Sequence, residues 1–505
     1  MARVGEEEIE EMPHDFDAIV VGSGAGGGPV AWCLAQAGKK VAIIEAGGFY
    51  TTNDFNRFEL LQLRRLWEKI RWTSNFELGL QKEIALGMGR CVGGSTTIFT
   101  AVAHRAPDHN FSEWYKATKI SNESGEPFSP KDLEPYYAQV ERDTSVRRYT
   151  EWDEGLKKID AGFKKIGHPF APVNAFIDMR CDQSGCLFGC PTEAKRGTLV
   201  SYIIPAILQG AEIFYNSTVT KVLFSKEGEN DSKRPRAFGV EFVNGETMET
   251  KRLTSKVVIV AAGALKTPIL LMKSGIKELA GETKSIDQIG RNFGANTATL
   301  VFGRFQEPLN NWILHPLSGQ MEDFSQKERG GFLLEASEVM EGPLGFSEVL
   351  VDDDGVPMWG RRHKEILKKY KYYAGIFINI HDSNDGRVFL DPETGREKYY
   401  KPITKEDESR FEAATSLCRE GLIAAGAQET LNTIYLSHHV QGSCRMGEDR
   451  SRSVVDSQCK SHDIEGLYVC DGSVIPSIVD ANPSLTIMAL SRRLGDHLLK
   501  NVLLD

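Results

Sequence analysis

The sequence predicts an α/β protein of two domains, in which one domain contains a buried parallel sheet. Three observations lead to this prediction. The chain has 505 residues, which is too long for one small core. A strand, a glycine-rich loop, a helix and a second strand follow one another within residues 16–45. Further buried-type strands come much later, at 256–262 and 467–470, so we expect a second domain to be inserted between the strands of the first.

The N-terminal unit has the clearest pattern. Residues 16–21 (FDAIVV) are short and rich in β-branched residues, as in a buried parallel strand. A helix is expected over 29–37, followed by a second strand over 41–44 that runs into Glu45. The loop between the first strand and the helix contains the pattern G-x-G-x-x-G, formed by Gly22, Gly24 and Gly27.

Each residue of this pattern has a physical task. Gly22 allows a sharp turn, Gly24 lets the backbone approach a pyrophosphate, and Gly27 lets the helix pack closely on the strand. The helix N-terminus then faces the phosphates, and Glu45 can accept hydrogen bonds from ribose hydroxyls. The unit therefore predicts a Rossmann-like dinucleotide site that suits FAD or NAD equally and disfavours a 2′-phosphate.

Composition excludes several other classes of function. The chain is 41% hydrophobic and 26% charged, with a formal net charge of −10. This negative charge argues against binding to nucleic acid or to an anionic membrane. No stretch reaches the ~20 apolar residues of a membrane helix, so we expect no membrane insertion. The acidic N-terminus lacks a secretory pattern, so a cytoplasmic location is expected, with periplasmic export alongside a partner as the alternative.

Four segments, taken in order, resemble the glucose–methanol–choline (GMC) oxidoreductase family. The first is the N-terminal unit described above. The second is GRCVGGSTTIFTAVAHRAP at 89–107, and the third is GALKTPILLMKSG at 263–275. The fourth is HHVQGSCRMG at 438–447, which is followed by LYVCDGSVIPS and NPSLTIMAL. Among its members, the pattern is nearest to the catalytic subunits of bacterial FAD-dependent glucose, sorbitol and fructose dehydrogenases.

The resemblance implies a two-domain architecture with a divided chain. A Rossmann-like FAD-binding domain, of the type shared with p-hydroxybenzoate hydroxylase, would be assembled from residues 14–105, 180–300 and 440–505. An α+β substrate domain, built on an antiparallel sheet with flanking helices, would come from residues 106–179 and 301–439.

The resemblance also places the chemistry. Oxidation of an alcohol needs a base for the hydroxyl proton and a sink for the hydride, and flavin N5 is the sink. Histidine suits the base because its ordinary pKa of about 6.5 lies near working pH. The family's catalytic histidine corresponds to His439, and its partner, His or Asn in relatives, corresponds to Asn482. For the neighbouring His438 we expect a packing role.

Further cofactor contacts are implied near the C-terminus and in the segment at 89–107, which resembles the Gly-Gly-Ser loop along the flavin and is called the flavin loop below. Where family members with a covalently linked flavin have His, this chain has Ile98, so we expect non-covalent FAD. Phe99 replaces the usual Asn and resembles the aromatic residue of sugar-oxidising branches, which favours a sugar substrate. The other contacts carried over are Gly93, Gly94 and Ser95 along the flavin, Val219 at the adenine, Asp471 and Gly472 near the ribityl and pyrophosphate, and Pro483 near the ring.

Three closely spaced cysteines form a separate feature, Cys181-x4-Cys186-x3-Cys190, followed by Pro191. Such spacing in a loop suits an iron–sulfur ligand set, and three thiolates would fit a [3Fe–4S] cluster. In the bacterial glucose dehydrogenase that this segment resembles, such a cluster passes electrons to a cytochrome subunit. The alternatives are another metal, loop thiols without a metal, or a disulfide beside a free thiol.

The leading functional hypothesis is a dehydrogenase that oxidises a CH–OH group of a small sugar or alcohol. Electrons would pass to an acceptor other than oxygen, such as a quinone, a cytochrome or a small partner subunit. The alternatives are an oxidase that forms hydrogen peroxide and a non-redox lyase that keeps FAD. A catalytically inactive FAD-binding subunit is disfavoured by the presence of both His439 and Asn482.

Overall fold

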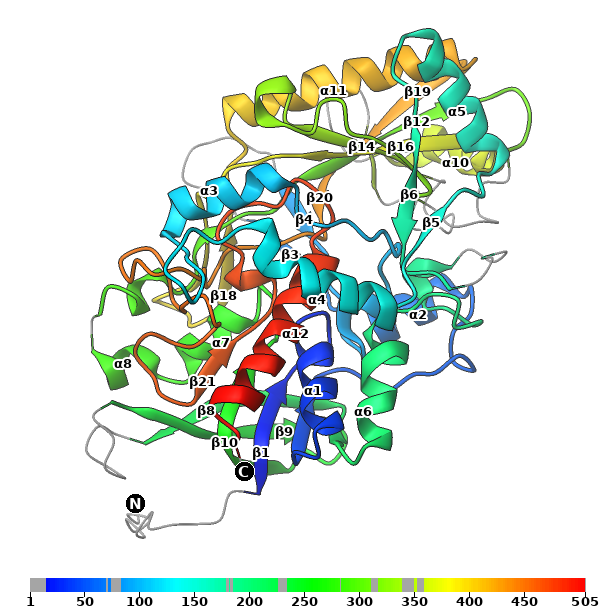
Figure 1. Ribbon diagram of the computed structural model, residues 1–505. Helices are drawn as coiled ribbons and strands as arrows, with labels where there is room; N and C mark the ends of the chain where they lie inside the picture. The colour runs from blue at the N-terminus through cyan, green and yellow to red at the C-terminus, as the bar shows by residue number, and fades with distance from the viewer. Residues whose placement is uncertain are drawn as a thin grey trace.

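The computed structural model describes residues 15–69, 71–73, 83–178, 181, 185–225, 234–281, 283–309, 317–337, 349–351 and 358–504. Two large sheets lie at opposite ends of the molecule, one with parallel strands beside α1 and α12 and one beneath α5 and α11 (Figure 1). The predicted combination of a Rossmann-like domain with an α+β domain is confirmed.

The parallel sheet is assembled from segments that are far apart in the sequence. Its order is β7 (Glu212–Phe214), β2 (Val41–Ile44), β1 (Phe16–Val21), β10 (Thr250–Val260) and β21 (Leu467–Val469), and all four pairings are parallel. The strands predicted at 16–21 and 41–44 match β1 and β2, whereas β10 begins earlier than predicted. Its first half leaves the parallel sheet and pairs elsewhere.

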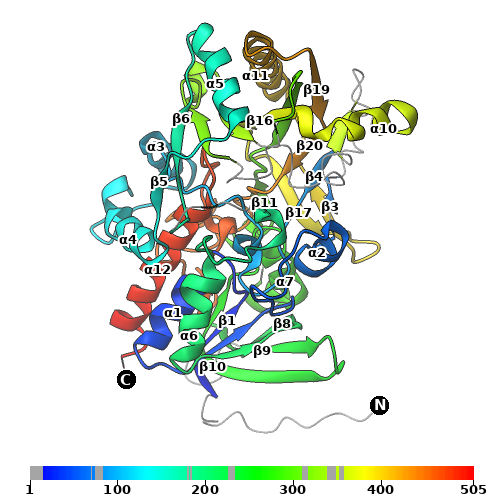
Figure 2. The ribbon, with the colours of Figure 1, turned by 90° about the vertical axis from the view of Figure 1, so that its right-hand side faces the viewer.

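That first half of β10 belongs to an antiparallel meander. It pairs with β9 (Arg236–Asn244), which pairs in turn with β8 (Ser217–Ser225). Figure 2 shows these three strands at the lower end of the molecule. One long strand can serve two pairings because the backbone groups of each half are satisfied by different neighbours.

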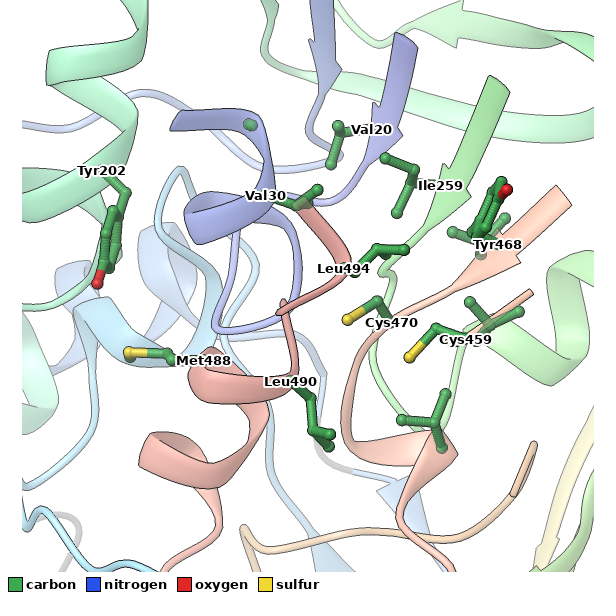
Figure 3. Close-up of a cluster of buried hydrophobic side chains, with 14 of the residues drawn as sticks. Val20, Val30, Tyr202, Ile259, Cys459, Tyr468, Cys470, Met488, Leu490 and Leu494 are labelled. Atoms are coloured by element: carbon green, nitrogen blue, oxygen red, sulfur yellow. The ribbon is translucent and has the colours of Figure 1, made fainter. Parts of the chain in front are cut away.

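Two helices cover the parallel sheet from one side. They are α1 (Gly27–Gln36), which overlaps the helix predicted over 29–37, and the C-terminal α12 (Ser484–Asn501). Val30 of α1 and Leu494 of α12 belong to one buried cluster with Val20 and Ile259 of the strands (Figure 3). The Ser491 hydroxyl lies 3.0 Å from the Val30 amide, so a polar contact also joins the two helices. The first and last segments of the chain are thereby packed together.

The second sheet is mainly antiparallel. Its order is β3 (Arg71–Trp72), β4 (Ile84–Leu86), β20 (Tyr435–Ser437), β12 (Ala298–Arg304), β16 (Tyr373–Ile380), β14 (Phe332–Ser337), β13 (Gly319–Met321), β6 (Ala171–Ala175) and β5 (Arg147–Tyr149). In addition, β19 (Glu429–Thr433) pairs with β12, and β15 (Leu350–Val351) pairs with β19. The pairing of β4 with β20 is the parallel exception. This finding confirms the predicted antiparallel sheet. The exact division of the chain into domains stays a prediction.

The two faces of this sheet have different neighbours. On one face, α5 (Glu154–Lys165) and α11 (Lys405–Ala424) close a core that includes Ile376 and Ile378. On the other face, Phe377 lines a large internal cavity. Because successive side chains of a strand point to opposite faces, β16 serves both the core and the cavity.

The remaining elements connect these layers. They are the helices α2 (Glu59–Leu66), α3 (Asp108–Thr118), α4 (Pro130–Asp143), α6 (Ile204–Leu208), α7 (Thr267–Lys273), α8 (Ile276–Ala280) and α10 (Gly360–Lys368), the short turns η1 (Gly94–Thr97), η2 (Cys186–Phe188), η3 (Leu199–Ile203), η5 (Ile286–Gln288), η6 (Lys327–Arg329), η7 (Tyr370–Tyr372) and η8 (Gly472–Val474), and a small sheet of β11 (Arg291–Phe293), β17 (Gly386–Leu390) and β18 (Glu397–Tyr400). Across the described ranges, none of the helices has the length and hydropathy needed to cross a membrane.

Candidate active site

The predicted glycine pattern forms a tight turn at the end of β1. Gly22 has φ +101°, and a Cβ there would lie 2.4 Å from the Ala261 carbonyl oxygen. A Cβ on Gly27 would lie 1.9 Å from the carbonyl oxygen of Gly22, so α1 could not pack this closely on the strand with any other residue. The tasks predicted for these two glycines therefore agree with the geometry.

A second glycine loop meets the first. The flavin-loop residues Gly93 and Gly94 both have positive φ, and a Cβ on Gly94 would lie 2.8 Å from the Cα of Gly24. The amide of Gly93 donates to the hydroxyl of Ser23 at 2.9 Å. Two segments about 70 residues apart in the sequence thus meet through glycine backbone and through the Ser23 hydroxyl. Such an arrangement leaves room for a ligand to approach both main chains.

Glu45 lies directly beyond the end of β2 and is 6% exposed. Its carboxylate accepts hydrogen bonds from the amide and hydroxyl of Ser23, at 3.1 and 2.7 Å, and from the Gly47 amide at 2.9 Å. Burial raises the pKa of Glu45, although these hydrogen bonds favour the charged form. The residue therefore borders the cavity as a buried acceptor, which suits ribose hydroxyls.

The two glycine loops and Glu45 form a cradle, and a cavity of about 860 Å³ runs from it to the antiparallel sheet. Its volume lies within the range of about 300–1,000 Å³ that is usual for ligand sites. Most residues predicted to contact the cofactor line it, namely Gly22, Gly24, Glu45, Gly94, Ser95, Val219, Asp471, Gly472 and Pro483. Gly27 and Gly93 do not line it and act by packing behind it.

Asp471 holds one wall of this cavity in place. Its carboxylate accepts from the Gly263 amide at 2.9 Å and from the Thr267 hydroxyl at 2.5 Å. It also accepts from the Ser473 amide at 2.7 Å. Asp471 thereby joins the segment that follows β10 to the segment that follows β21. Its predicted role near a cofactor stays a prediction, since its own contacts are structural.

The two residues predicted to carry the chemistry meet at the wall of the cavity. His439, just after β20, lies with its Nε2 3.3 Å from the side-chain nitrogen of Asn482, which precedes α12. Its other ring nitrogen, Nδ1, lies 3.0 Å from the side-chain oxygen of Asn296. An amide oxygen only accepts, so Nδ1 carries the proton and Nε2 presents a lone pair. This is the tautomer that a proton acceptor at Nε2 requires.

The surroundings keep this imidazole neutral. Burial, followed by the neighbouring His438 and His104, lowers the pKa of His439 to about 3. Burial likewise lowers the pKa of His438 to about 4. The ring of His438 borders the cavity and packs edge-on against Trp67, with the ring centroids 5.6 Å apart. The packing role of His438 stays a prediction, since its ring both contacts Trp67 and borders the cavity.

Asn296 is a site residue that the sequence analysis missed. It is 1% exposed and has φ +46°, and its side-chain nitrogen donates to the Ile380 carbonyl at 2.9 Å. Its oxygen is thus directed at His439 by a fixed amide. No motif surrounds residue 296. The one available signal is that Asn tolerates left-handed backbone better than most residues, which says nothing about the imidazole.

Lys195 is a second residue that the sequence analysis missed. Its ammonium is buried and donates to the carbonyl oxygens of Thr97, Phe99 and Cys186, at 2.8, 3.1 and 2.5 Å. One cation thus ties the flavin loop to the cysteine loop. Phe99 borders the cavity, and its ring lies 5.3 Å from that of Phe176.

The cysteine loop does not form the expected ligand set. The structure describes Cys181, Cys186 and Cys190, while residues 182–184 lie outside the described part of the chain. Cys190 Sγ accepts from the Lys195 amide at 3.4 Å and lies 3.5 Å from the Thr192 hydroxyl. Within the described residues, no three His, Cys, Asp or Glu side chains are arranged to hold a metal ion. The three thiols are spaced along the sequence like ligands, but among the described residues they do not form a group that could hold a metal ion.

Comparison with known proteins decides the family. Models described as GMC oxidoreductase match residues 17–298 and 375–491, which together make up most of the chain. The chain belongs to the GMC oxidoreductase family. This result confirms the resemblance drawn from the four sequence segments, and it makes the protein an oxidoreductase whose cofactor is expected to be FAD.

Several relatives cover almost the whole chain. A long-chain-alcohol oxidase of Arabidopsis thaliana is 27% identical over 94% of this chain, which spans 66% of that protein. A cholesterol oxidase of Acinetobacter baumannii is 23% identical, covering 95% of this chain and 94% of the relative. Pyridoxine 4-oxidase from Mesorbium loti shares the fold with a TM-score of 0.72 at 16% identity, covering 96% of this chain and 99% of that chain. Formate oxidase does so with a TM-score of 0.71 at 15% identity, covering 96% and 98%.

The residues present fit FAD. The two glycine loops leave a cradle that a single Cβ would fill, and the buried Glu45 stands where ribose hydroxyls need an acceptor. The cavity then continues past Ser95 to His439 and Asn482. A long ligand can therefore place one end in the cradle and its other end beside the imidazole.

Proposed function

We propose that the chain oxidises the CH–OH group of an alcohol, with FAD held in the cradle described above. The single observation that supports this proposal is the arrangement of His439 at the cavity wall. Its Nε2 lone pair is directed by Asn296 and faces Asn482. Bound flavin supplies the acceptor for a hydride leaving the substrate carbon.

The side chains of the protein accept the proton of the substrate hydroxyl and stabilise the substrate oxygen. Nε2 of His439 accepts the proton of the substrate hydroxyl as its C–H bond breaks. The side-chain nitrogen of Asn482 lies 3.3 Å from Nε2, close enough to donate to the same substrate oxygen and stabilise its developing negative charge. Desolvation keeps the imidazole neutral before reaction, so no proton must first be removed from it.

The cavity wall favours an apolar alcohol. Beside the catalytic pair, the antiparallel sheet and its neighbours contribute mainly apolar side chains, namely Leu300, Leu317, Phe377 and Leu436. Binding a sugar requires several well-placed polar partners for its hydroxyls, whereas an alkyl chain gains from burial against such a wall. The names of the relatives, long-chain-alcohol oxidase and cholesterol oxidase, point the same way. We therefore propose an apolar alcohol in place of the sugar that Phe99 suggested.

We further propose that FAD is held without a covalent bond, because Ile98 offers no nucleophilic nitrogen. Acid precipitation is expected to release all of the yellow colour into the supernatant. Colour retained in the pellet would contradict this proposal.

The electron acceptor is a separate question. The route to a cytochrome through an iron–sulfur cluster has no ligand set in the cysteine loop among the described residues. Because the named relatives are oxidases, we propose oxygen as the acceptor. Turnover measured in air against turnover with an artificial quinone under nitrogen tests this choice.

The substrate proposal is tested by bleaching of the flavin absorbance under anaerobic conditions. The panel contains primary alcohols of increasing chain length, a sterol, glucose and a hydroxynitrile. Bleaching that becomes faster with chain length supports an apolar alcohol. Bleaching by glucose alone contradicts it, and hydroxynitrile cleavage without any bleaching supports a lyase instead.

A further inference from the structure

A buried ionic cluster lies outside the site just described. The carboxylate of Asp480 accepts hydrogen bonds from Nε2 of His109 on α3 and from Nδ1 of His381, the residue that follows β16. Asp480 is 5% exposed, and Glu113 lies 3.9 Å from the far nitrogen of His381. Burial would raise the pKa of Asp480, yet the two histidines hold it below its ordinary value. The cluster therefore holds a charged carboxylate inside the protein.

Asp480 stands two residues before Asn482, in the loop between η8 and α12. Other contacts hold the same loop. Asn110 donates to the Ile478 carbonyl at 3.2 Å, and the Trp114 indole donates to the Ser477 carbonyl at 3.2 Å. These residues belong to α3, as His109 does. The position of Asn482 is thus set by contacts that reach across to a helix outside the FAD cradle.

The residue after His381 supports the other member of the catalytic pair. The carboxylate of Asp382 accepts from the amides of Asn296 and Thr297, both at 3.1 Å, and from the Thr297 hydroxyl at 2.6 Å. Asn296 in turn accepts from Nδ1 of His439. Asp382 is therefore one amide, that of Asn296, removed from His439. His381 contacts Asp480, which stands two residues before Asn482 in the chain.

The turn at 381–382 is itself fixed on the side of the antiparallel sheet. The His381 amide donates to the Gly331 carbonyl, and its carbonyl accepts from the Arg410 guanidinium of α11, both at 2.8 Å. The Lys401 ammonium lies 3.8 Å from Asp382. The contacts that hold the 381–382 turn, and through it the catalytic pair, thus extend to the antiparallel sheet that lines the apolar part of the cavity.

We propose that the His381–Asp382 turn positions both His439 and Asn482. Asp382 positions His439 through Asn296, and His381 positions the loop that carries Asn482 through its hydrogen bond to Asp480. Asp480 is a positioning residue in this proposal, because it touches neither cavity nor substrate in the described contacts. The proposal rests on the function proposed above for His439 and Asn482. Positioning of this kind matters, since a displacement of about 1 Å at a reacting group can cost about 100-fold in rate.

A double-mutant cycle separates this role from a general effect on stability. The variants are Asp480→Asn, Asn482→Ala and the two combined, assayed as FAD-loaded full chains with an alcohol that bleaches the flavin. Asp480→Asn removes the charge that attracts both histidines while keeping the shape. We expect it to lower kcat about 10-fold or more and to change KM by less than about twofold. In the Asn482→Ala background the same substitution is expected to have almost no further effect on kcat.

The matched control is Asp323→Asn. Asp323 accepts from His168 at 3.0 Å at an exposed site, so it repeats the chemistry away from the cavity. This variant is expected to keep the wild-type kcat. An equal loss of kcat from Asp480→Asn with and without Asn482, or no loss at all, would overturn the proposal.

Two further measurements keep the proposal testable if Asp480→Asn does not fold or if alcohols are not substrates. In the first, His109→Leu removes one donor to Asp480, while His109→Gln retains a donor and is expected to restore kcat. In the second, a crystal structure of a folded holoprotein variant of the cluster, Asp480→Asn or His109→Leu, reads the geometry without turnover. We expect the Asn482 nitrogen to leave hydrogen-bond distance of His439 Nε2, and an unmoved amide would refute the positioning role. Failure of the proposed function would instead show as absence of alcohol-dependent bleaching in the wild type.

Discussion

Replacing Asn296 by Gly tests how the base is oriented. Asn296 has left-handed backbone, φ +46°, so Gly removes the side chain without the strain that Ala would introduce there. The substitution deletes the acceptor that lies 3.0 Å from Nδ1 of His439. The imidazole can then move its proton to Nε2, where it would block proton uptake from the substrate.

The size of the effect follows from that single contact. Leaving a buried N–H without a partner costs about 1–3 kcal/mol. If this cost destabilises the tautomer of His439 that is protonated at Nδ1 and acts as the base, kcat/KM decreases by about 5- to 150-fold. The loss of the donor to the Ile380 carbonyl lowers stability as well, so the free energy of unfolding has to be measured beside the rate.

The assay is the rate of anaerobic flavin bleaching with saturating and limiting alcohol, on protein with its full flavin absorbance. Asn296→Asp is the comparison variant, because it retains an oxygen acceptor and adds a negative charge. That charge is expected to raise the pKa of His439, and since the base must be neutral, the acid limb of kcat/KM moves to higher pH. A kcat/KM for Asn296→Gly within about twofold of the wild type would refute the reasoning.

Three other predictions follow from the same structure. Gly27→Ala places a Cβ 1.9 Å from a carbonyl oxygen, so we expect less folded, flavin-containing protein, measured by absorbance and thermal unfolding. Because burial lowers the pKa of His439 to about 3, kcat/KM is expected to stay level down to about pH 5, and an acid limb near about 6.5 would contradict this. The hydrogen bond to Asp480 raises the pKa of His109, and it raises that of His381 against the effect of burial. The stability from these contacts is present below about pH 6.5 and is lost as the pH rises through the raised values, so Asp480→Asn should lower Tm more at about pH 6 than at about pH 9.

The sequence predicted the parts of this protein in which chemistry and local structure share one short segment. The glycines before α1 and the strands around them were found because the turn, the close packing and the acid at residue 45 follow one another within 30 residues. His439 was distinguished from His438 by its correspondence to the catalytic histidine of the family within the segment at 438–447. Among the described hydrogen bonds, only His439 contacts both Asn296 and Asn482, and its role as the base stays a prediction.

What the sequence could not predict lies in contacts between distant segments. Asn296 and Asp382 are 86 residues apart, and Asp480 meets His109 across 371 residues, and no sequence pattern pairs either residue with its partner. For the cysteine loop, a clear local pattern gave an expectation that the structure does not support. Spacing along the sequence does not decide where each thiol lies in the fold. The sugar inference depended on Phe99 alone, whereas the apolar wall is formed by residues from β12, β16 and β20 that no local pattern marks.

The most direct test of the central claim is the reductive half-reaction of the His439→Gln variant, measured in a stopped-flow instrument without oxygen. The variant should retain the yellow flavin spectrum and bind alcohol, since position 439 only borders the cofactor cavity. We predict that an apolar alcohol bleaches the wild-type flavin rapidly and the variant at least about 100-fold more slowly. Equal bleaching rates in the two proteins would contradict the account.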